Sequence, residues 1–235
     1  MKNIAVLVDE RISKSCEDSL LGLGFKIIKL PRIDRLPSAI ASHTDILAFK
    51  LFDKIFFSRA YFEANFDLLS PLDREKVILT EENQGVNYPF DAIFNGLLVG
   101  NRLFCKKYSF SKEILTHSEA IGIKTVAVKQ GYPACTALKI SENAVITADV
   151  GMARTLSSEG IEVLLIENGD ISLPPYEYGF IGGAAGAYGD EIFFFGDIKS
   201  HRNADEIIKF IEKNGKRTVS LSYEPLSDLG GMIFI

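Results

Sequence analysis

Residues 136–147, Thr136-Ala-Leu-Lys-Ile-Ser-Glu-Asn-Ala-Val-Ile-Thr147, contain the pattern that decides the fold. Two largely apolar runs flank Glu142-Asn143, and turn-forming residues between two such runs are typical of a β-hairpin. A segment with a helical pattern follows, and then the stretch Gly160-Ile-Glu-Val-Leu164. The glycine suits the position just beyond a helix end, where a positive φ favours a residue without Cβ. This part of the chain therefore predicts a unit of strand, strand, helix and strand.

The same unit recurs along the chain. Similar hairpins are expected over residues 45–57, with a turn near Asp53-Lys54, and over residues 92–105, with a turn at Gly100-Asn101. Four units are expected to start near His43, Phe90, Cys135 and Tyr178. A glycine just beyond an expected helix, followed by a strand-like run, occurs four times: Gly24-Phe-Lys-Ile-Ile28, Gly122-Ile-Lys-Thr-Val126, Gly160-Ile-Glu-Val-Leu164 and Gly215-Lys-Arg-Thr-Val219.

The two ends of the chain supply a fifth unit. Residues 3–8 form a lone apolar strand followed by a helix and a strand, and residues 230–235 form a lone apolar strand at the other end. Pairing of these two strands would complete the unit, close a ring and remove two exposed sheet edges. We therefore predict an α/β fold with five such units in one domain over residues 1–235. The alternative is a doubly wound α/β sheet, which would need single strands alternating with helices.

Residues 178–190 contain five glycines, which raises the possibility of a phosphate-binding loop. Phosphate loops of the dinucleotide or Walker kind lead from a strand into a helix. Here the glycines lead into Glu191-Ile-Phe-Phe-Phe195, which has the composition of a strand. The run is therefore interpreted as the first strand of the last hairpin, with a turn at residues 188–190. Its small residues would allow close backbone packing or leave space for a ligand.

Composition excludes several classes of function. Of the 235 residues, 47% are hydrophobic and 24% are charged, and the net charge is −5, so we expect a globular protein that binds neither nucleic acid nor an anionic membrane. The initial apolar run is too short for a signal peptide. Three cysteines without a Cys-x-x-Cys pair are expected to be free thiols in a reducing cytoplasm. Neither a Walker loop nor zinc-ligand spacing occurs, so no metal or other cofactor is expected.

A closed ring of five strand-strand-helix-strand units resembles the pentein fold, an α/β propeller. That superfamily includes arginine and agmatine deiminases, dimethylarginine hydrolase and amidinotransferases, together with a non-enzymatic factor that keeps ribosomal subunits apart. In the enzymes, a catalytic Cys and a His-x-Asp motif each open the first strand of a unit, at the same end of a central channel. The resemblance covers nearly the whole chain but rests mainly on architecture.

Two short motifs carry the resemblance to the enzymes. His43-Thr44-Asp45 opens one unit, and Cys135, in Gln130-Gly-Tyr-Pro-Ala-Cys-Thr136, opens the unit two steps later. The resemblance implies that Cys135 is a nucleophile, that His43 transfers protons and that Asp45 orients or binds the substrate. The enzymes also have a Cys after a Gly-Gly near the C-terminus. This chain departs from that pattern, because Gly230-Gly231 is followed by methionine.

Carbon–nitrogen cleavage at a guanidine also needs carboxylates to hold the planar cation. The residues expected to reach the channel are Asp228, Glu177, Asp9 and Glu10, with Asn95 as a further hydrogen-bonding group. The first hypothesis is therefore an enzyme that acts on a small polar molecule, cationic if it is a guanidine. The second is a catalytically silent pentein that acts as a binding or assembly factor with a protein partner. Cys135 would then be a buried structural residue, which is the usual role of a free cysteine.

Overall fold

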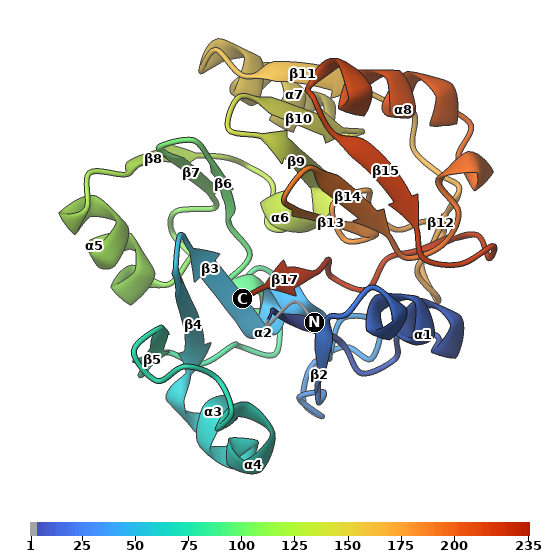
Figure 1. Cartoon of the computed structure of the whole chain (residues 1–235). Coiled ribbons are helices and arrows are strands. Elements are labelled where there is room, and N and C mark those ends of the chain that lie inside the picture. The colour runs from blue at the N-terminus through green and yellow to red at the C-terminus, as the bar shows by residue number, and fades with distance from the viewer. Residues whose placement is uncertain (1–3) are drawn as a thin grey trace.

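The computed structural model describes residues 4–235. Within that range five three-stranded sheets are arranged in a ring, with the longer helices at its periphery (Figure 1). In each sheet the middle strand is antiparallel to one neighbour and parallel to the other. The antiparallel pair is the hairpin, or its equivalent made from the two ends, and the parallel strand returns after the helix. The predicted fold class is thus confirmed, and the single doubly wound sheet is excluded.

The units follow one another along the chain. The first contains β1 (Ala5–Asp9), α1 (Lys14–Gly22), β2 (Lys26–Leu30) and β17 (Ile233–Phe234). The second contains α2 (Thr44–Leu47), β3 (Ala48–Leu51), β4 (Lys54–Ser58), α3 (Arg59–Ala64), α4 (Phe66–Leu69) and β5 (Val77–Thr80). The third contains η1 (Phe90–Ala92), β6 (Leu97–Val99), β7 (Arg102–Cys105), α5 (Lys112–Ala120) and β8 (Lys124–Ala127).

The fourth unit contains α6 (Pro133–Thr136), β9 (Ala137–Ser141), β10 (Ala144–Thr147), α7 (Val150–Ser158) and β11 (Glu162–Leu165). The fifth contains β13 (Ala185–Tyr188), β14 (Glu191–Phe194), η2 (Ile198–Ser200), α8 (Ala204–Lys213) and β15 (Arg217–Ser220). A further parallel pair, β12 (Ile171–Ser172) and β16 (Leu226–Ser227), joins the segments on either side of the fifth unit.

Strands from the two ends of the chain close the ring. β1 pairs antiparallel with β17, with Val6 opposite Phe234 and Leu7 opposite Ile233. The backbones of Ala5 and Ile235 exchange two further hydrogen bonds, of 3.1 and 2.8 Å. β1 therefore has a partner on both sides and presents no free edge.

The repeated glycines end helices as predicted. Gly160 has a φ of 79° and Gly122 a φ of 80°, and a Cβ added at either position would meet no atom within 4 Å. Space is therefore not the reason for glycine at these positions. The reason is the left-handed backbone conformation, which L residues with a side chain adopt only with strain.

Local details of the second unit differ from prediction. The hairpin turns at Phe52-Asp53, one residue earlier than expected, and Phe52 has a φ of 54°. More importantly, the first strands of the second and fourth units begin at Ala48 and Ala137. Short helical turns precede both of them, so His43 and Cys135 do not open strands as expected.

The sequence around Cys135 explains this correction. Pro133 occupies the first turn of α6, where its missing N–H leaves no hydrogen bond unmade. The N–H of Ala134 donates to the side chain of Asn95 (2.8 Å) instead of to a neighbouring strand. In α2 the N–H of Asp45 donates to the carbonyl of Gly230 (3.1 Å). Both turns are therefore held by partners outside their own sheets.

Only the second half of the glycine-rich run is a strand. Residues 181–184 form turns, β13 follows, and the predicted turn before β14 is present at Gly189-Asp190. A Cβ on Gly182 would collide with the carbonyl of Ala134, and one on Gly183 would collide with the carboxylate of Asp228. These glycines therefore allow the run to pack directly against α6 and Asp228, as the close-packing interpretation requires.

Hydrophobic clusters fill the space between the sheets. On β14 alternate side chains point to opposite faces: Phe194 packs in the cluster beneath α8, and Phe193 packs with Val6 and Phe25 of the first unit. Neighbouring units thus share side chains from one strand, which holds the ring together laterally. No helix within residues 4–235 is both long enough and apolar enough to cross a membrane.

Candidate active site

Three side chains predicted to act together meet between the second and fourth units. One ligand atom each from His43, Asp45 and Cys135 all lie within 4.8 Å of one another, and all three residues are buried. His43 is the residue immediately before α2, Asp45 lies in α2, and Cys135 lies in α6. The two helical turns therefore bring together residues that are 90 positions apart in the chain.

Hydrogen bonds link Cys135 to Asp45 and Asn95. The thiol donates to Oδ2 of Asp45 (2.6 Å), and Nδ2 of Asn95 lies 3.8 Å from the sulfur. Oδ1 of Asn95 accepts the hydrogen bond from the N–H of Ala134. Asn95 thus holds α6 in position and also contacts the sulfur. The second carboxylate oxygen of Asp45, Oδ1, is buried and has no hydrogen-bond partner within residues 4–235.

His43 lies beside Asp228, with 3.8 Å between Nδ1 and Oδ1. Oδ2 of Asp228 accepts a hydrogen bond from the N–H of Phe180 (2.9 Å), and Oδ1 accepts one from the N–H of Gly230 (3.1 Å). These bonds fix the carboxylate next to the imidazole. Neither ring nitrogen of His43 has a hydrogen-bond partner in the described part of the chain, although both are buried.

Gly230 explains the Gly-Gly motif that lacks a cysteine. Its φ is 71°, and an added Cβ would lie 2.5 Å from Cβ of His43. A side chain at this position would therefore be strained and would also displace His43. In this chain Gly230 packs against His43, and its N–H donates a hydrogen bond to Asp228.

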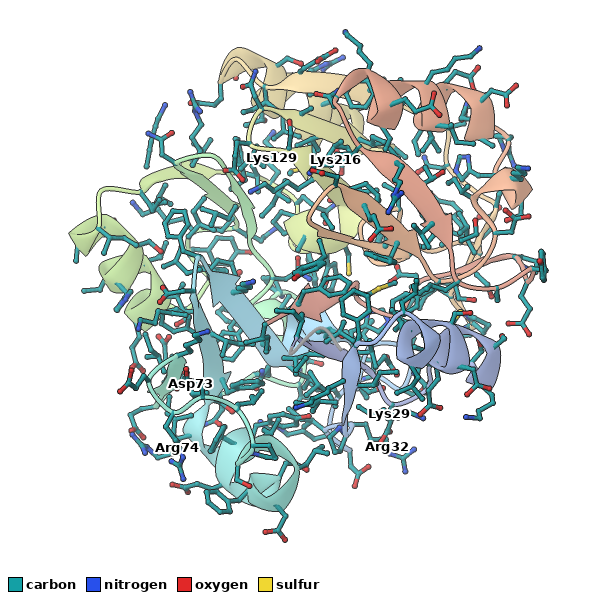
Figure 2. All side chains as sticks on the ribbon, viewed as in Figure 1. Lys29, Arg32, Asp73, Arg74, Lys129 and Lys216 are labelled. Atoms are coloured by element: carbon teal, nitrogen blue, oxygen red, sulfur yellow. The ribbon has the colours of Figure 1, made fainter. Side chains whose placement is uncertain are left out.

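A cavity of about 580 Å³ opens over this group. Its inner wall includes His43, Cys135 and Asp228, and Glu177 lies at its exposed end. The remaining wall is mostly apolar or aromatic: Ile40, Tyr88, Gln130, Tyr132, Leu173, Tyr176, Tyr178 and Phe180. Arg32 and Arg74 lie at the lower edge of the molecule in Figure 2. This cavity has the size and composition of a small-molecule site.

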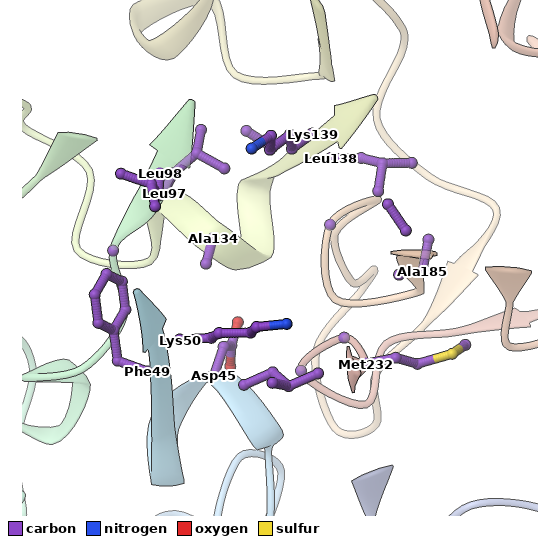
Figure 3. Close-up of a pocket in the computed structure, with 18 of the residues that line it drawn as sticks. Asp45, Phe49, Lys50, Leu97, Leu98, Ala134, Leu138, Lys139, Ala185 and Met232 are labelled. Atoms are coloured by element: carbon purple, nitrogen blue, oxygen red, sulfur yellow. The ribbon is translucent and has the colours of Figure 1, made fainter. Parts of the chain in front are cut away.

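A second cavity, of about 390 Å³, adjoins Asp45. Asp45, Lys50, Lys139, Leu138 and Met232 contribute to its wall (Figure 3). The ammonium group of Lys50 donates to the carbonyl of Phe234. Cys135 and His43 do not line this cavity, and Asp45 does not line the larger one. Asp45 therefore lies between the two cavities.

Burial sets the protonation of the group. It raises the pKa of Asp45 to about 8 and raises the pKa of Asp228 as well. Burial and the nearby carboxylates of Asp45 and Asp228 raise the pKa of the Cys135 thiol well above its ordinary value. Burial lowers the pKa of His43, although the charge of Asp228 acts in the opposite direction. Without a ligand, the site therefore holds a neutral thiol, a neutral imidazole and a protonated Asp45 at neutral pH.

The other predicted residues are placed as follows. Asn95 and Asp228 are part of the buried group, and Glu177 is at the mouth of the larger cavity. Asp9, the last residue of β1, forms an ion pair with Arg11 (2.6 Å) and accepts a hydrogen bond from Ser42 (2.8 Å). Asp9 thus supports the segment before His43 without lining either cavity. Glu10 also lies outside both cavities.

Sequence reasoning missed the aromatic wall of the cavity. Tyr88 and Tyr132 come from loops of different units, with ring centroids 5.4 Å apart. The hydroxyl of Tyr132 donates to Asp91 (2.8 Å). The signal that would have found part of this wall is the alternation Tyr176-Glu177-Tyr178, which places aromatic rings on either side of an acid in a loop.

The buried group also offers ligands for a metal ion. A thiolate, an imidazole and a carboxylate are donor types that bind Zn²⁺. One ligand atom from each of the three residues lies within 4.8 Å of the other two. No zinc-like spacing occurs along the sequence because His43 and Cys135 lie in different units. Deprotonation of the thiol would have to accompany such binding.

Comparisons with known proteins support the fold and the family. DDAH from Pseudomonas aeruginosa, solved as a mutant complexed with citrulline, superposes with a TM-score of 0.60 at 10% identity over 93% of this chain and 92% of that chain. Agmatine deiminase from C. jejuni gives 0.56 at 10% identity over 94% and 87%. SxtG, an amidinotransferase from Microseira wollei, gives 0.51 at 13% identity over 88% and 73%.

At sequence identities of 10% to 13%, the similarity to these structures shows the fold alone. A search of curated proteins finds no match. The family of unknown function DUF6873 matches residues 7–233, almost the whole chain. The protein therefore belongs to the DUF6873 family and has the pentein fold.

Proposed function

We propose that the protein is a cysteine-dependent hydrolase or amidinotransferase that acts on a guanidine- or amidine-like small molecule in the 580 Å³ cavity. The observation that carries this proposal is the meeting of His43, Asp45 and Cys135 within 4.8 Å beside that cavity. The structural neighbours include proteins named for reactions of guanidino compounds, which is consistent with the proposal.

Binding of the planar cation is assigned to Asp228, which lines the cavity. Asp45 does not line it, but it accepts the hydrogen bond of the Cys135 thiol and therefore influences the state of that thiol. Carboxylates hold guanidinium groups by charge-assisted hydrogen bonds. Since the pKa of Asp45 is raised to about 8, binding of a cation would release its proton at neutral pH. The bound positive charge would also lower the pKa of Cys135 and so favour the thiolate.

The covalent step follows from the positions of the thiol and the imidazole. The proton of Cys135 passes to neutral His43, and the thiolate forms a bond to the central carbon of the guanidine. The imidazolium then gives this proton to the leaving nitrogen, the carbon–nitrogen bond breaks, and an amine departs. An amidino group remains on Cys135. Water then attacks the same carbon, His43 takes its proton, and the carbon–sulfur bond breaks as the thiol is reprotonated. An amine acceptor in place of water would make the reaction a transfer.

The first prediction tests Cys135 with 2-chloroacetamidine, in which a thiolate displaces chloride and forms a stable thioether. We expect one adduct per chain on the native protein, located at Cys135 by peptide mass spectrometry. Cys135→Ala should abolish it. The matched control is Cys105→Ala, because burial raises the pKa of Cys105 to about 12 and it lies outside both cavities. Labelling at Cys16 or Cys105 with Cys135 spared would refute the proposed nucleophile.

A second candidate function is a catalytically silent binding or assembly factor. The buried, neutral thiol and the absence of a cysteine after Gly230-Gly231 favour it. The same labelling experiment separates the two functions. A silent pentein would leave Cys135 unmodified in the native state, and the reagent would reach this residue only after unfolding in urea.

A further inference from the structure

We infer that the substrate is a guanidine whose far end carries a second positive charge and no carboxylate. This inference rests on the proposed function and names the substrate class of the same site. Its basis is the wall of the 580 Å³ cavity beyond the reacting group.

The side chains that line the cavity, within residues 4–235, include no lysine or arginine to bind a carboxylate. Its acidic residues are Glu177 and Asp228, and its other ionisable residues are His43, Cys135 and several tyrosines. Burial lowers the pKa of His43 and raises that of Cys135, so both are neutral without a ligand. Recognition of a substrate carboxylate normally uses an arginine or lysine side chain, so an amino-acid tail would bring a negative charge to a wall of acids and aromatic rings.

Two cations in the loops around the site, Arg11 and Lys106, already have partners. Arg11 binds Asp9 through both Nε (2.9 Å) and Nη2 (2.6 Å). The ammonium of Lys106 donates to the carbonyl of Lys129 (2.6 Å) and to the hydroxyl of Tyr88 (3.1 Å). Neither Arg11 nor Lys106 lines the cavity. Turning Arg11 toward a substrate would break its bonds to Asp9.

The outer wall is suited to a cation instead. Glu177 stands at the exposed end between two tyrosines, and the faces of aromatic rings attract positive charge. The aromatic residues of the wall are Tyr88, Tyr132, Tyr176, Tyr178 and Phe180. Lys106 itself lies 5.1 Å from the centre of the Tyr88 ring, so this wall already binds one ammonium group at its edge.

The segment that carries Glu177 is held at both ends. The N–H of Tyr176 donates to the carbonyl of Leu173 (2.8 Å), and the N–H of Gly179 donates to the carbonyl of Ile171 (2.7 Å). Phe180 is bound in turn by Asp228, the carboxylate beside His43. Residues 177–180 therefore carry the outer carboxylate and also donate a hydrogen bond to the inner one. A substrate with two positive ends would find both acids already in place.

The second prediction compares three ligands on the Cys135→Ser protein by isothermal titration calorimetry. They are 4-aminobutylguanidine, which has a cationic tail, butylguanidine, which has a neutral tail, and arginine, which adds a carboxylate to the tail. We expect 4-aminobutylguanidine to bind at least tenfold more tightly than butylguanidine, and arginine to bind no more tightly than butylguanidine. Glu177→Gln should reduce the tenfold ratio at least threefold. Glu206→Gln, an exposed change on α8, should leave the ratio unchanged.

Equal or tighter binding of arginine than of 4-aminobutylguanidine would overturn the inference. So would a ratio that Glu177→Gln leaves unchanged. Labelling of wild-type Cys135 by 2-chloroacetamidine, measured in parallel, separates these failures from failure of the proposed function. If Cys135 is labelled but the protein prefers arginine, only the inferred charge at the far end of the substrate is wrong. An unlabelled Cys135 together with no binding of any guanidine would remove the proposed function and this inference with it.

Discussion

At the scale of single residues, Asp45 connects most of the chemistry described above. One of its oxygens holds the thiol of Cys135, the other has no partner within residues 4–235, and the residue lies between two cavities. Burial of a carboxyl group favours its neutral form. The unbound protein therefore stores a proton at Asp45 that the unfolded chain would lose near pH 4, which gives this residue a measurable effect on stability.

The third prediction concerns that effect. The pKa of Asp45 is raised from 3.8 to about 8, so between these values the folded state binds a proton that the unfolded state does not. The contribution of Asp45 to the free energy of unfolding should therefore fall as the pH rises from about 4 to about 8. Asp45→Asn removes this contribution, so its free energy of unfolding relative to wild type should increase steadily when urea unfolding is measured at pH 5, 6, 7 and 8. Asp205→Asn, an exposed control on α8, should keep the wild-type slope. Identical slopes in wild type and Asp45→Asn would contradict the assignment.

At the scale of elements, two kinds of glycine have different tasks. Gly160 ends a helix and faces open space, whereas Gly230 has a similar φ but packs against His43. In the sequence alone, nothing separates the role of Gly160 from that of Gly230. What distinguishes them is the segment that packs against Gly230, and that segment is remote in the sequence.

The fourth prediction uses this pair. Gly160→Ala should cost about 1 kcal/mol, because it adds backbone strain alone. Gly230→Ala should cost more, about 2–4 kcal/mol, because its Cβ also meets His43. It should in addition slow the labelling of Cys135 by 2-chloroacetamidine at least tenfold under conditions where the protein remains folded. Circular dichroism during urea unfolding gives the stabilities. Equal effects of the two substitutions on labelling would show that Gly230 does not support the site.

The elements also show what sequence could and could not predict. The hairpin at residues 136–147 and the helix-ending glycines are local patterns, and they led to the correct unit and the correct ring. The helical turns α2 and α6 were missed because their hydrogen bonds go to Gly230 and Asn95, which lie in other units. The meeting of His43, Asp45 and Cys135 was expected from the resemblance. The aromatic wall was not, because Tyr88, Tyr132 and Tyr176 come from separate loops.

At the scale of the whole molecule, closure of the ring depends on β17, a strand of two residues. Phe234 compensates for this short length. It is buried, and its ring lies 5.1 Å from that of Phe25, 5.2 Å from that of Tyr188 and 5.4 Å from that of Phe193. The first and fifth units are therefore joined by aromatic packing as much as by backbone hydrogen bonds.

The fifth prediction tests this closure. Phe234→Ala should lower the free energy of unfolding by about 3–5 kcal/mol, because it leaves a cavity in the cluster of the first unit. It should also promote association, because loosening of β17 uncovers the edge of β1. Phe66→Ala, at a partly exposed position on α4, should cost clearly less. Urea unfolding and sizing by light scattering measure the two effects. A monomeric Phe234→Ala protein with near-normal stability would show that closure does not depend on this residue.

The helical turns α2 and α6 occupy corresponding places in their units, each just before the strand that begins a hairpin. In a ring of similar units these places are related by rotation, so any of them can present a side chain toward the same centre. The order in which a thiol, an imidazole and a Gly-Gly appear along a chain is then free to change while their spatial arrangement stays the same. Corresponding side chains in a ring of this kind should therefore be sought by superposing one unit on another, because the order of the motifs along the chain does not fix their places around the centre.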